Sequence, residues 1–181
     1  MFTNYVPEID KNWLKEQFEI VLRELDSHDY TVNEPDVFSD ALGGEKYHRM
    51  KPAAKAMKNY AMKIGFLHQA IAGQLPGWND LVLGEGVDVR SDDEQTNFYI
   101  KNKANTWNSS SKAQELTKID DLRARGKTAY AVLINCKSKN IKDSRIIDGK
   151  EFYKMVSGRE DFFDHLVETF KSYQESIAIS S

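Results

Sequence analysis

The sequence predicts an α/β fold in which a mixed central sheet is flanked by helices within a single domain. Helical periodicity marks both ends of the chain, and β-branched and aromatic segments lie between them. No repeat or linker divides the 181 residues, which suffice to bury a core. We expect an N-terminal helical part over about residues 1–75, a hairpin and sheet over about 78–150, and a C-terminal helix over about 159–176.

The N-terminal part contains two expected helices. The first covers residues 10–27, where Asp10 can cap the helix and apolar residues recur at helical spacing. Residues 29–51 are polar and contain glycines, so we expect a loop or short helices there. Pro52 suits the first turn of the second helix, which continues through AAKAMKNYAMKIGFLHQAIAG.

The middle of the chain changes to strand-like composition. The segments LVLGEGVDVR (81–90) and TNFYIKN (96–102) predict two short strands, with SDDEQ as the turn of a hairpin between them.

A helix and two more strands are expected after the hairpin. One of the serines at 109–111 can cap a third helix, which would run to about Arg125 and end at Gly126. KTAYAVLINC (127–136) predicts a buried central strand, and SRIIDGKEF (144–152) predicts a short strand and a turn before the last helix.

The charges are unevenly distributed along the chain. The formal net charge of −3 argues against indiscriminate binding to polyanions. No acidic residue occurs from Lys46 to Asn79 or from Gln95 to Gln114, and an acidic cluster separates these runs. A solvated basic helix face explains one such run, but two of them favour a local anion-binding surface.

The expected compartment is the cytoplasm. Cys136 is the single cysteine, so an intramolecular disulfide is excluded. The N-terminus lacks the basic and apolar regions of a secretory signal, and the longest apolar runs fall far short of the roughly 20 residues of a membrane span. We therefore expect a soluble protein without membrane contact.

An acidic and a basic residue mark the expected hairpin. Asp88 on the first strand and Lys101, thirteen residues later on the second, can meet at one sheet edge. A carboxylate there can bind a divalent cation that activates a water, and a lysine ammonium can stabilise charge on a pentavalent phosphate. A surface hairpin with a weak ion pair has the same pattern, because this spacing is unspecific.

The run YIKNKANTWNSSS (99–111) is dense in hydrogen-bond donors. Amides, hydroxyls and ammonium groups bind phosphate oxygens and base edges, and a helix starting at the serines would present free N–H groups to an anion. Trp107 is expected to anchor this run to the core. Candidate DNA contacts are Lys103, Asn105, Thr106, Asn108, Ser109, Ser110, Ser111 and Lys112, with Lys55 and Lys58 on the preceding helix; His68 and Gln69 are weaker site candidates.

The run VDVRSDDEQTNFYIKNKANTWNSSS resembles the centre of a type II restriction endonuclease family that cuts GGNCC-type sites. In that family an aspartate-bearing strand and a hairpin precede a strand of the form (I/V)-Glu-x-Lys-Asn-Lys-x-Asn-Thr, followed by Asn-Ser-Ser-Ser. GFLHQAIAGQLPGW (65–78) and KTAYAVLINCK (127–137) extend the likeness to about residues 60–170. The resemblance implies a PD-(D/E)XK nuclease fold and Mg²⁺-dependent hydrolysis of DNA, with Asp88 as metal ligand and Lys101 as the lysine of the motif.

One position departs from the family pattern. Tyr99 stands where a metal-binding acid is expected, and a phenol is a poor Mg²⁺ ligand at neutral pH. Three explanations remain open: an altered register, a chain that binds DNA but cuts poorly, or a second carboxylate from another position. Glu85 is the candidate to bind the metal together with Asp88, although it would need a bulge at Gly84 or Gly86 to share the face of Asp88. The other nearby acids are Asp92, Asp93 and Glu94.

The resulting expectation is a Mg²⁺-dependent type II restriction endonuclease acting on double-stranded DNA. A homodimer is expected because a palindromic site is most simply read by a two-fold dimer. The alternatives are a catalytically silent DNA-binding variant of the same fold and an interaction domain that binds no nucleic acid.

Overall fold

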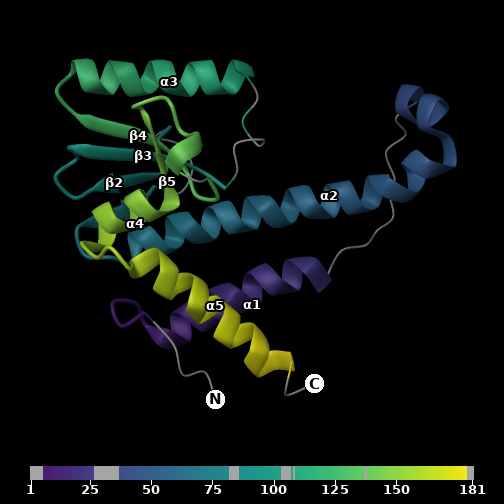
Figure 1. Cartoon of the computed structure of the whole chain (residues 1–181), viewed down its shortest axis with the longest axis horizontal. Coiled ribbons are helices and arrows are strands. Elements are labelled where there is room, and N and C mark those ends of the chain that lie inside the picture. Colours follow the sequence, from purple (N-terminus) through teal and green to yellow (C-terminus); the bar gives the residue numbers. More distant parts are fainter. Residues whose placement is uncertain are drawn as a thin grey trace.

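A computed structural model of the chain describes residues 6–26, 37–81, 86–102, 107, 109–136 and 138–178. At its centre is one five-stranded sheet with the order β1-β2-β3-β4-β5 (Figure 1). The first three strands pair antiparallel, whereas β3, β4 and β5 pair parallel, which confirms the expected mixed sheet. The strands are β1 (Trp78–Asp80), β2 (Val89–Ser91), β3 (Thr96–Lys101), β4 (Thr128–Leu133) and β5 (Ile146–Asp148).

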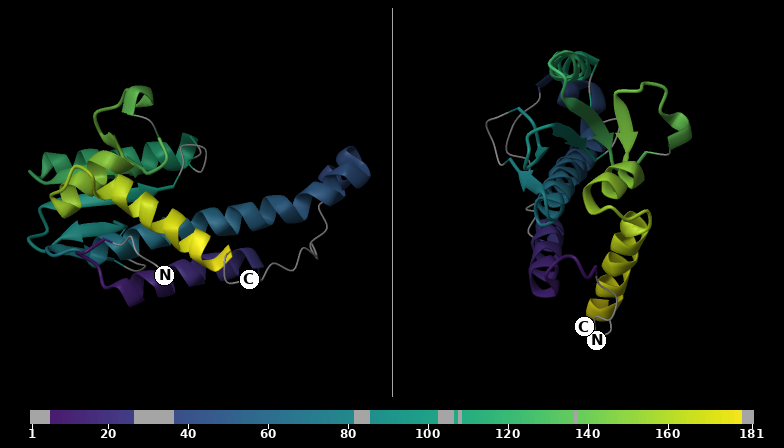
Figure 2. Two further views of the ribbon diagram at one scale, coloured as in Figure 1. Left: turned by 60° about the horizontal axis from the view of Figure 1, so that its bottom comes forward. Right: turned by 90° about the vertical axis from the view of Figure 1, so that its left-hand side faces the viewer.

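Helices cover both faces of the sheet (Figures 1 and 2). One apolar cluster joins α3 to the sheet, and a larger one joins the opposite face to the other four helices. The side chains of β3 alternate between these clusters, with Phe98 and Ile100 in the larger one and Tyr99 under α3. The helices are α1 (Lys11–Asp26), α2 (Val37–Gly73), α3 (Ser109–Ala124), α4 (Gly149–Ser157) and α5 (Phe162–Ala178), with a short 3₁₀ turn, η2, at Ser138–Asn140.

The first helix forms where the sequence predicts it. The carboxylate of Asp10 accepts a hydrogen bond from the amide of Trp13 at 2.8 Å, which satisfies one free donor of the helix start. Leu14 and Phe18 are buried one turn apart against the core.

The second helix is longer than expected. It begins at Val37, so the expected loop or short helices over 29–51 are wrong from residue 37 onward, while residues 27–36 lie outside the described part. Pro52 lies inside this helix and not in its first turn. A proline removes one backbone hydrogen bond, which a helix of 37 residues tolerates because the turns on either side remain paired.

The first expected strand is also corrected. In place of one strand over 81–90, the structure has β1 before this segment and β2 at its end. Gly86 has φ +72°, a left-handed conformation that interrupts an extended strand. Residues 82–85 lie outside the described part.

The turn expected in SRIIDGKEF is a helix. Asp148 caps α4 by accepting from the amide of Glu151 at 2.9 Å, and Gly158 closes it in the left-handed conformation. Gly149 is required at the start of α4, because a Cβ there would lie 2.6 Å from the carbonyl oxygen of Ile134. This close approach lets α4 follow β5 directly.

The third helix begins at Ser109, so the serines occupy its first turn. The serines are therefore helical residues, and residue 108 before them lies outside the described part. Gly126, with φ +79°, follows the helix end as expected.

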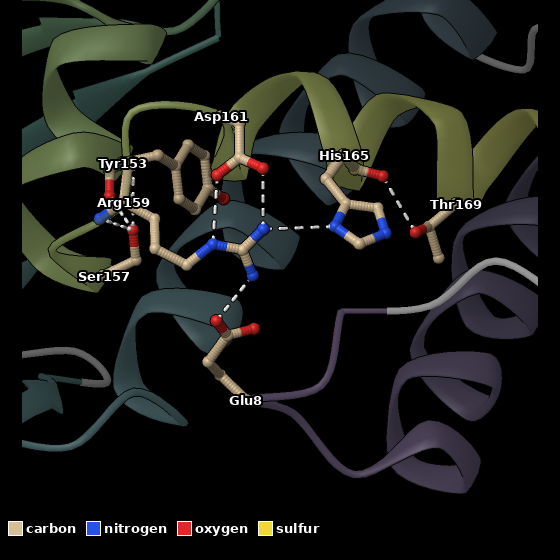
Figure 3. A network of polar contacts seen from close by, with 7 residues as sticks. All are labelled: Glu8, Tyr153, Ser157, Arg159, Asp161, His165 and Thr169. Carbon is tan, nitrogen blue, oxygen red and sulfur yellow. Dashed lines mark hydrogen bonds and ion pairs between the residues drawn. The ribbon is translucent and has the colours of Figure 1, made fainter.

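Arg159 ties the N-terminal segment to the connection between α4 and α5 (Figure 3). Its guanidinium lies 2.6 Å from the carboxylate of Glu8 and 2.8 Å from that of Asp161. A planar guanidinium can bind both carboxylates at once, so Arg159 connects the segment before α1 to the segment before α5.

Within the described residues, none of the helices has the length and apolar character needed to span a bilayer.

Candidate active site

A cleft of about 840 Å³ lies between α2, the end of β3 and the first turns of α3. A smaller cavity of about 270 Å³, beside the start of β2, shares several of its lining residues. The polar residues that line the cleft include Lys58, Gln69, Asp88, Lys101, Ser111 and Glu115.

Asp88 is held at the edge of β3 by both its backbone and its side chain. Its amide donates to the carbonyl of Phe98 at 2.9 Å, and its Oδ2 accepts from the amide of Ile100 at 2.5 Å. Burial raises the pKa of Asp88, and the Ile100 amide and the positive charge of Lys101 partly offset this rise. A bound cation would favour the ionised form further.

Asp80 on β1 is a neighbouring carboxyl group. Burial raises its pKa, and the negative charge of Asp88 adds to the effect. Its buried Oδ1 has no hydrogen-bond partner among the described residues.

Lys101 is fixed at the carboxyl end of β3. Its carbonyl accepts from the amide of Ile134 at 3.0 Å, and the adjacent Asn102 contacts Asn135 through both side chain and backbone. Its ammonium lies 2.9 Å from Oε1 of Glu115 on α3. The structure thus brings Asp88 and Lys101 into one cleft, together with an acid that was not among the sequence candidates.

Tyr99 lies on the same sheet face as Lys101 and is 5% exposed. Burial raises the pKa of Tyr99, and the negative charges of Glu115 and Asp88 raise it further. The phenol therefore stays neutral at physiological pH and is a poor ligand for a hard cation.

The acids of the hairpin turn lie at the other end of β3. Asp92 accepts from the side-chain amide of Asn79 at 2.7 Å, and Asp93 accepts from the Ser91 hydroxyl at 2.5 Å. Glu94 lies 4.0 Å from the ammonium of Lys127. β3 runs from this turn to Lys101, so these three acids do not join Asp88 in the cleft. Glu85 lies outside the described residues.

The donor-rich segment is described only in part. Lys103, Asn105, Thr106 and Asn108 lie outside the described residues, as does the side chain of Lys55. Ser109 and Ser110 are exposed at the start of α3, and Ser111 and Lys58 line the cleft.

Trp107 is the anchor that the sequence predicts. It is buried in the cluster under α3, and the ammonium of Lys112 lies 5.5 Å from its ring centroid. The tryptophan therefore connects the donor-rich segment to the core, while Lys112 remains at the surface.

His68 and Gln69 occupy different environments. The Nδ1 atom of His68 lies 2.8 Å from the Tyr153 hydroxyl, and burial lowers the histidine pKa to about 4. His68 is therefore a neutral core residue away from the cleft. Gln69, one position later on α2, lines both the cleft and the smaller cavity.

Glu115 is the residue that sequence reasoning missed. One signal was present, because Glu115 is the first acid after the acid-free run from Gln95 to Gln114. It also follows Ser111 by four residues, one helical turn, and both side chains line the cleft.

The cleft suits a hard divalent cation such as the Mg²⁺ that the nuclease resemblance implies. Asp88 supplies carboxylate oxygen, and the buried Oε2 of Glu115 has no hydrogen-bond partner among the described residues. The described part contains no cluster of three or more His, Cys, Asp or Glu side chains. Mg²⁺ commonly takes one or two carboxylates and completes its coordination with water and substrate phosphate, so this donor set fits.

Comparison with known proteins identifies relatives of one kind. The chain is 27% identical to the type II restriction enzyme Eco47II of Escherichia coli over 150 residues, which cover 67% of this chain and 62% of that enzyme. It is 24% identical to the type II restriction enzyme Sau96I of Staphylococcus aureus over 185 aligned positions, covering 85% of this chain and 71% of that enzyme. No solved structure matches the chain significantly.

A family model also matches most of the chain. The profile of the Eco47II restriction endonucleases matches residues 45–177, which include the sheet, α3, α4 and every residue that lines the cleft. The chain therefore belongs to the Eco47II restriction endonuclease family.

Proposed function

We propose that this protein is a Mg²⁺-dependent type II restriction endonuclease of the PD-(D/E)XK superfamily, which hydrolyses phosphodiesters of double-stranded DNA at a short GGNCC-like site. The observation that carries the proposal is the convergence of Asp88 and Lys101 in one cleft of a chain that belongs to a restriction endonuclease family. The two relatives are named type II restriction enzymes, and the chain spans 62% of the length of the E. coli enzyme.

The cleft residues have complementary roles in this reaction. Bound Mg²⁺ would polarise the scissile phosphate and lower the pKa of a coordinated water. Asp88 provides an oxygen ligand for the ion, and the Ile100 amide orients its carboxylate. Lys101 presents an ammonium that stabilises the negative charge developing on the phosphate and orients the attacking water. Its contact with Glu115 keeps this ammonium in the cleft.

The surface around the cleft suits a DNA backbone. Lys58 on α2 is an exposed cation that lines the cleft, and Lys112 on α3 is an exposed cation that lies over Trp107, which also lines it. Ser109 and Ser110 offer hydroxyl groups at the start of α3. Phosphate contacts of this kind set the position and orientation of a protein on a duplex. We propose a homodimer, because two copies related by a two-fold axis would each cut one strand of a palindromic site.

A silent DNA-binding variant is the second candidate, and one observation favours it. Tyr99 occupies the position of an expected acid and is neutral, so a chain with Asp88 as its sole metal ligand would bind DNA and cut poorly. Cleavage tests separate this candidate from the first.

The test is incubation of the purified protein with unmethylated plasmid that carries many GGNCC sites, with Mg²⁺ and with EDTA. Discrete fragments in Mg²⁺ alone would support the endonuclease, and their ends would give the recognised site. Intact plasmid in both samples would contradict it. A gel-shift titration of the same DNA at rising salt would then distinguish a silent DNA-binding variant from an interaction domain that binds no nucleic acid. Phosphate contacts make DNA affinity fall steeply with salt, so only the DNA-binding variant would show a salt-dependent shift.

A further inference from the structure

We propose that Glu115 on α3 supplies the second metal-binding carboxylate that position 99 lacks, so that Asp88 and Glu115 together form the Mg²⁺ site. This inference rests on the proposed nuclease function and names the ligand set of its site. It also accounts for a tyrosine at a position where the family pattern has an acid.

The first argument is the location of Glu115 relative to Tyr99. Tyr99 and Lys101 are two residues apart on β3, so both lie on the sheet face that α3 covers. Leu116 and Ile119 of α3 are buried against that face. Glu115 therefore projects from the helix into the region above the end of β3. It lines the smaller cavity of about 270 Å³ together with Tyr99, Asp88 and Lys101.

The second argument is the incomplete bonding of the Glu115 carboxylate. Oε1 lies 2.9 Å from the Lys101 ammonium, whereas Oε2 is buried with no hydrogen-bond partner among the described residues. Buried carboxylate oxygens are normally paired, because leaving one unpaired costs free energy. A cation between Asp88 and Glu115 would satisfy this oxygen without disturbing the contact to Lys101.

A purely structural role for Glu115 makes a different prediction. If Glu115 only positions Lys101, its amide variant would still permit metal binding through Asp88. If Glu115 is a ligand, metal affinity falls even without DNA. The measurement must therefore report on the bound ion and not on cleavage alone.

Terbium luminescence provides this measurement. Tb³⁺ binds the same hard oxygen ligands as Mg²⁺, and Trp107 and Tyr99 line the two cavities, where they can transfer excitation energy to a bound ion. The titration uses the full chain without DNA, followed by displacement with Mg²⁺. The variants are Glu115→Gln and Asp88→Asn. The matched control is Glu160→Gln, which loses an exposed contact of 2.8 Å to Lys154.

The expected wild-type result is a saturable Tb³⁺ signal that Mg²⁺ displaces. The Tb³⁺ affinity should fall by at least about tenfold in Glu115→Gln and Asp88→Asn, because losing a metal ligand should cost at least as much as losing a group that only hydrogen-bonds to a ligand. Glu160→Gln should bind Tb³⁺ as the wild type does. Wild-type affinity in Glu115→Gln would overturn the proposal, as would a wild-type chain with no saturable signal.

A second, independent test moves the carboxylate from position 115 to position 99. Tyr99→Glu in the Glu115→Gln background returns an acid to the face above β3, so Tb³⁺ affinity should recover toward wild type. A double variant that keeps wild-type circular dichroism but binds no better than Glu115→Gln would overturn the claim that Glu115 replaces the acid of position 99.

Cleavage assays separate this inference from the nuclease proposal. A wild-type chain that binds Tb³⁺ through Glu115 but cuts no DNA would contradict the nuclease and leave the metal site standing. A wild-type chain that cuts DNA as fast as its Glu115→Gln variant would contradict the role of Glu115 alone.

Discussion

The ammonium of Lys101 lies 2.9 Å from Oε1 of Glu115, and this contact joins the carboxyl end of β3 to α3. The two side chains are 26% and 18% exposed, so solvent screens this pair less than it screens a surface ion pair. The contact holds the Lys101 ammonium in the cleft beside Asp88.

Replacing Lys101 by alanine should slow cleavage at least about 100-fold and leave specific DNA binding measurable. Loss of one charge-stabilising group costs about 10²–10³ in rate, and the phosphate contacts around the cleft remain. Plasmid cleavage in Mg²⁺ and gel shifts in Ca²⁺ measure the two effects separately. Lys171→Ala is the control, because Lys171 contacts Glu168 at the surface of α5. Undiminished cutting by Lys101→Ala would show that another group assists the nucleophile.

Replacing Lys112 by alanine should weaken DNA binding for all sequences alike. A lysine that contacts one phosphate contributes about one unit to the slope of log affinity against log salt, so the variant should show a correspondingly shallower slope. Titrations of one duplex at several salt concentrations measure this slope, again with Lys171→Ala as control. An unchanged slope would place Lys112 outside the DNA-binding surface.

Replacing Tyr99 by glutamate alone should destabilise the metal-free protein at neutral pH. The new carboxylate would be buried close to the negative charges of Asp88 and Glu115, which already raise the pKa of Tyr99. Mg²⁺ should restore part of the lost melting temperature, and Tyr99→Phe, which adds no charge, serves as control. We expect no large gain in cleavage if Glu115 already acts as ligand. A large gain would identify the wild-type chain as a disabled nuclease.

The buried His68 should make folding stability depend on pH. Its pKa is about 4 in the folded chain against 6.5 when unfolded, so the unfolded state binds more protons between these values. The contribution of His68 is therefore fully present above about pH 6.5 and is lost as pH falls toward 4, by an amount on the order of 3 kcal/mol. Urea unfolding between pH 7 and pH 4 measures it. His68→Gln should flatten the curve. Equal curves for His68→Gln and wild type would refute the assignment.

Local patterns predicted the elements whose signals are contained in a few residues. Asp10 and the periodicity after it predicted α1, β-branched and aromatic content predicted β3, and an apolar run predicted β4. The start of α2 and the whole of α4 were missed. Gly149 is a weak helix former by propensity, and only its close packing against Ile134 and the cap from Asp148 favour a helix there.

In the candidate site, the sequence also identified some residues, and others were found only in the folded structure. Asp88 and Lys101 flank one antiparallel pairing, so hairpin geometry alone brings them to one sheet edge, and the sequence determined this pair together with the family resemblance. Glu115 could not be chosen from the sequence, because any residue on one side of α3 could face the sheet until the helix is docked. The packing of Leu116 and Ile119 against the sheet sets the rotation of α3, and that rotation directs Glu115 into the cleft.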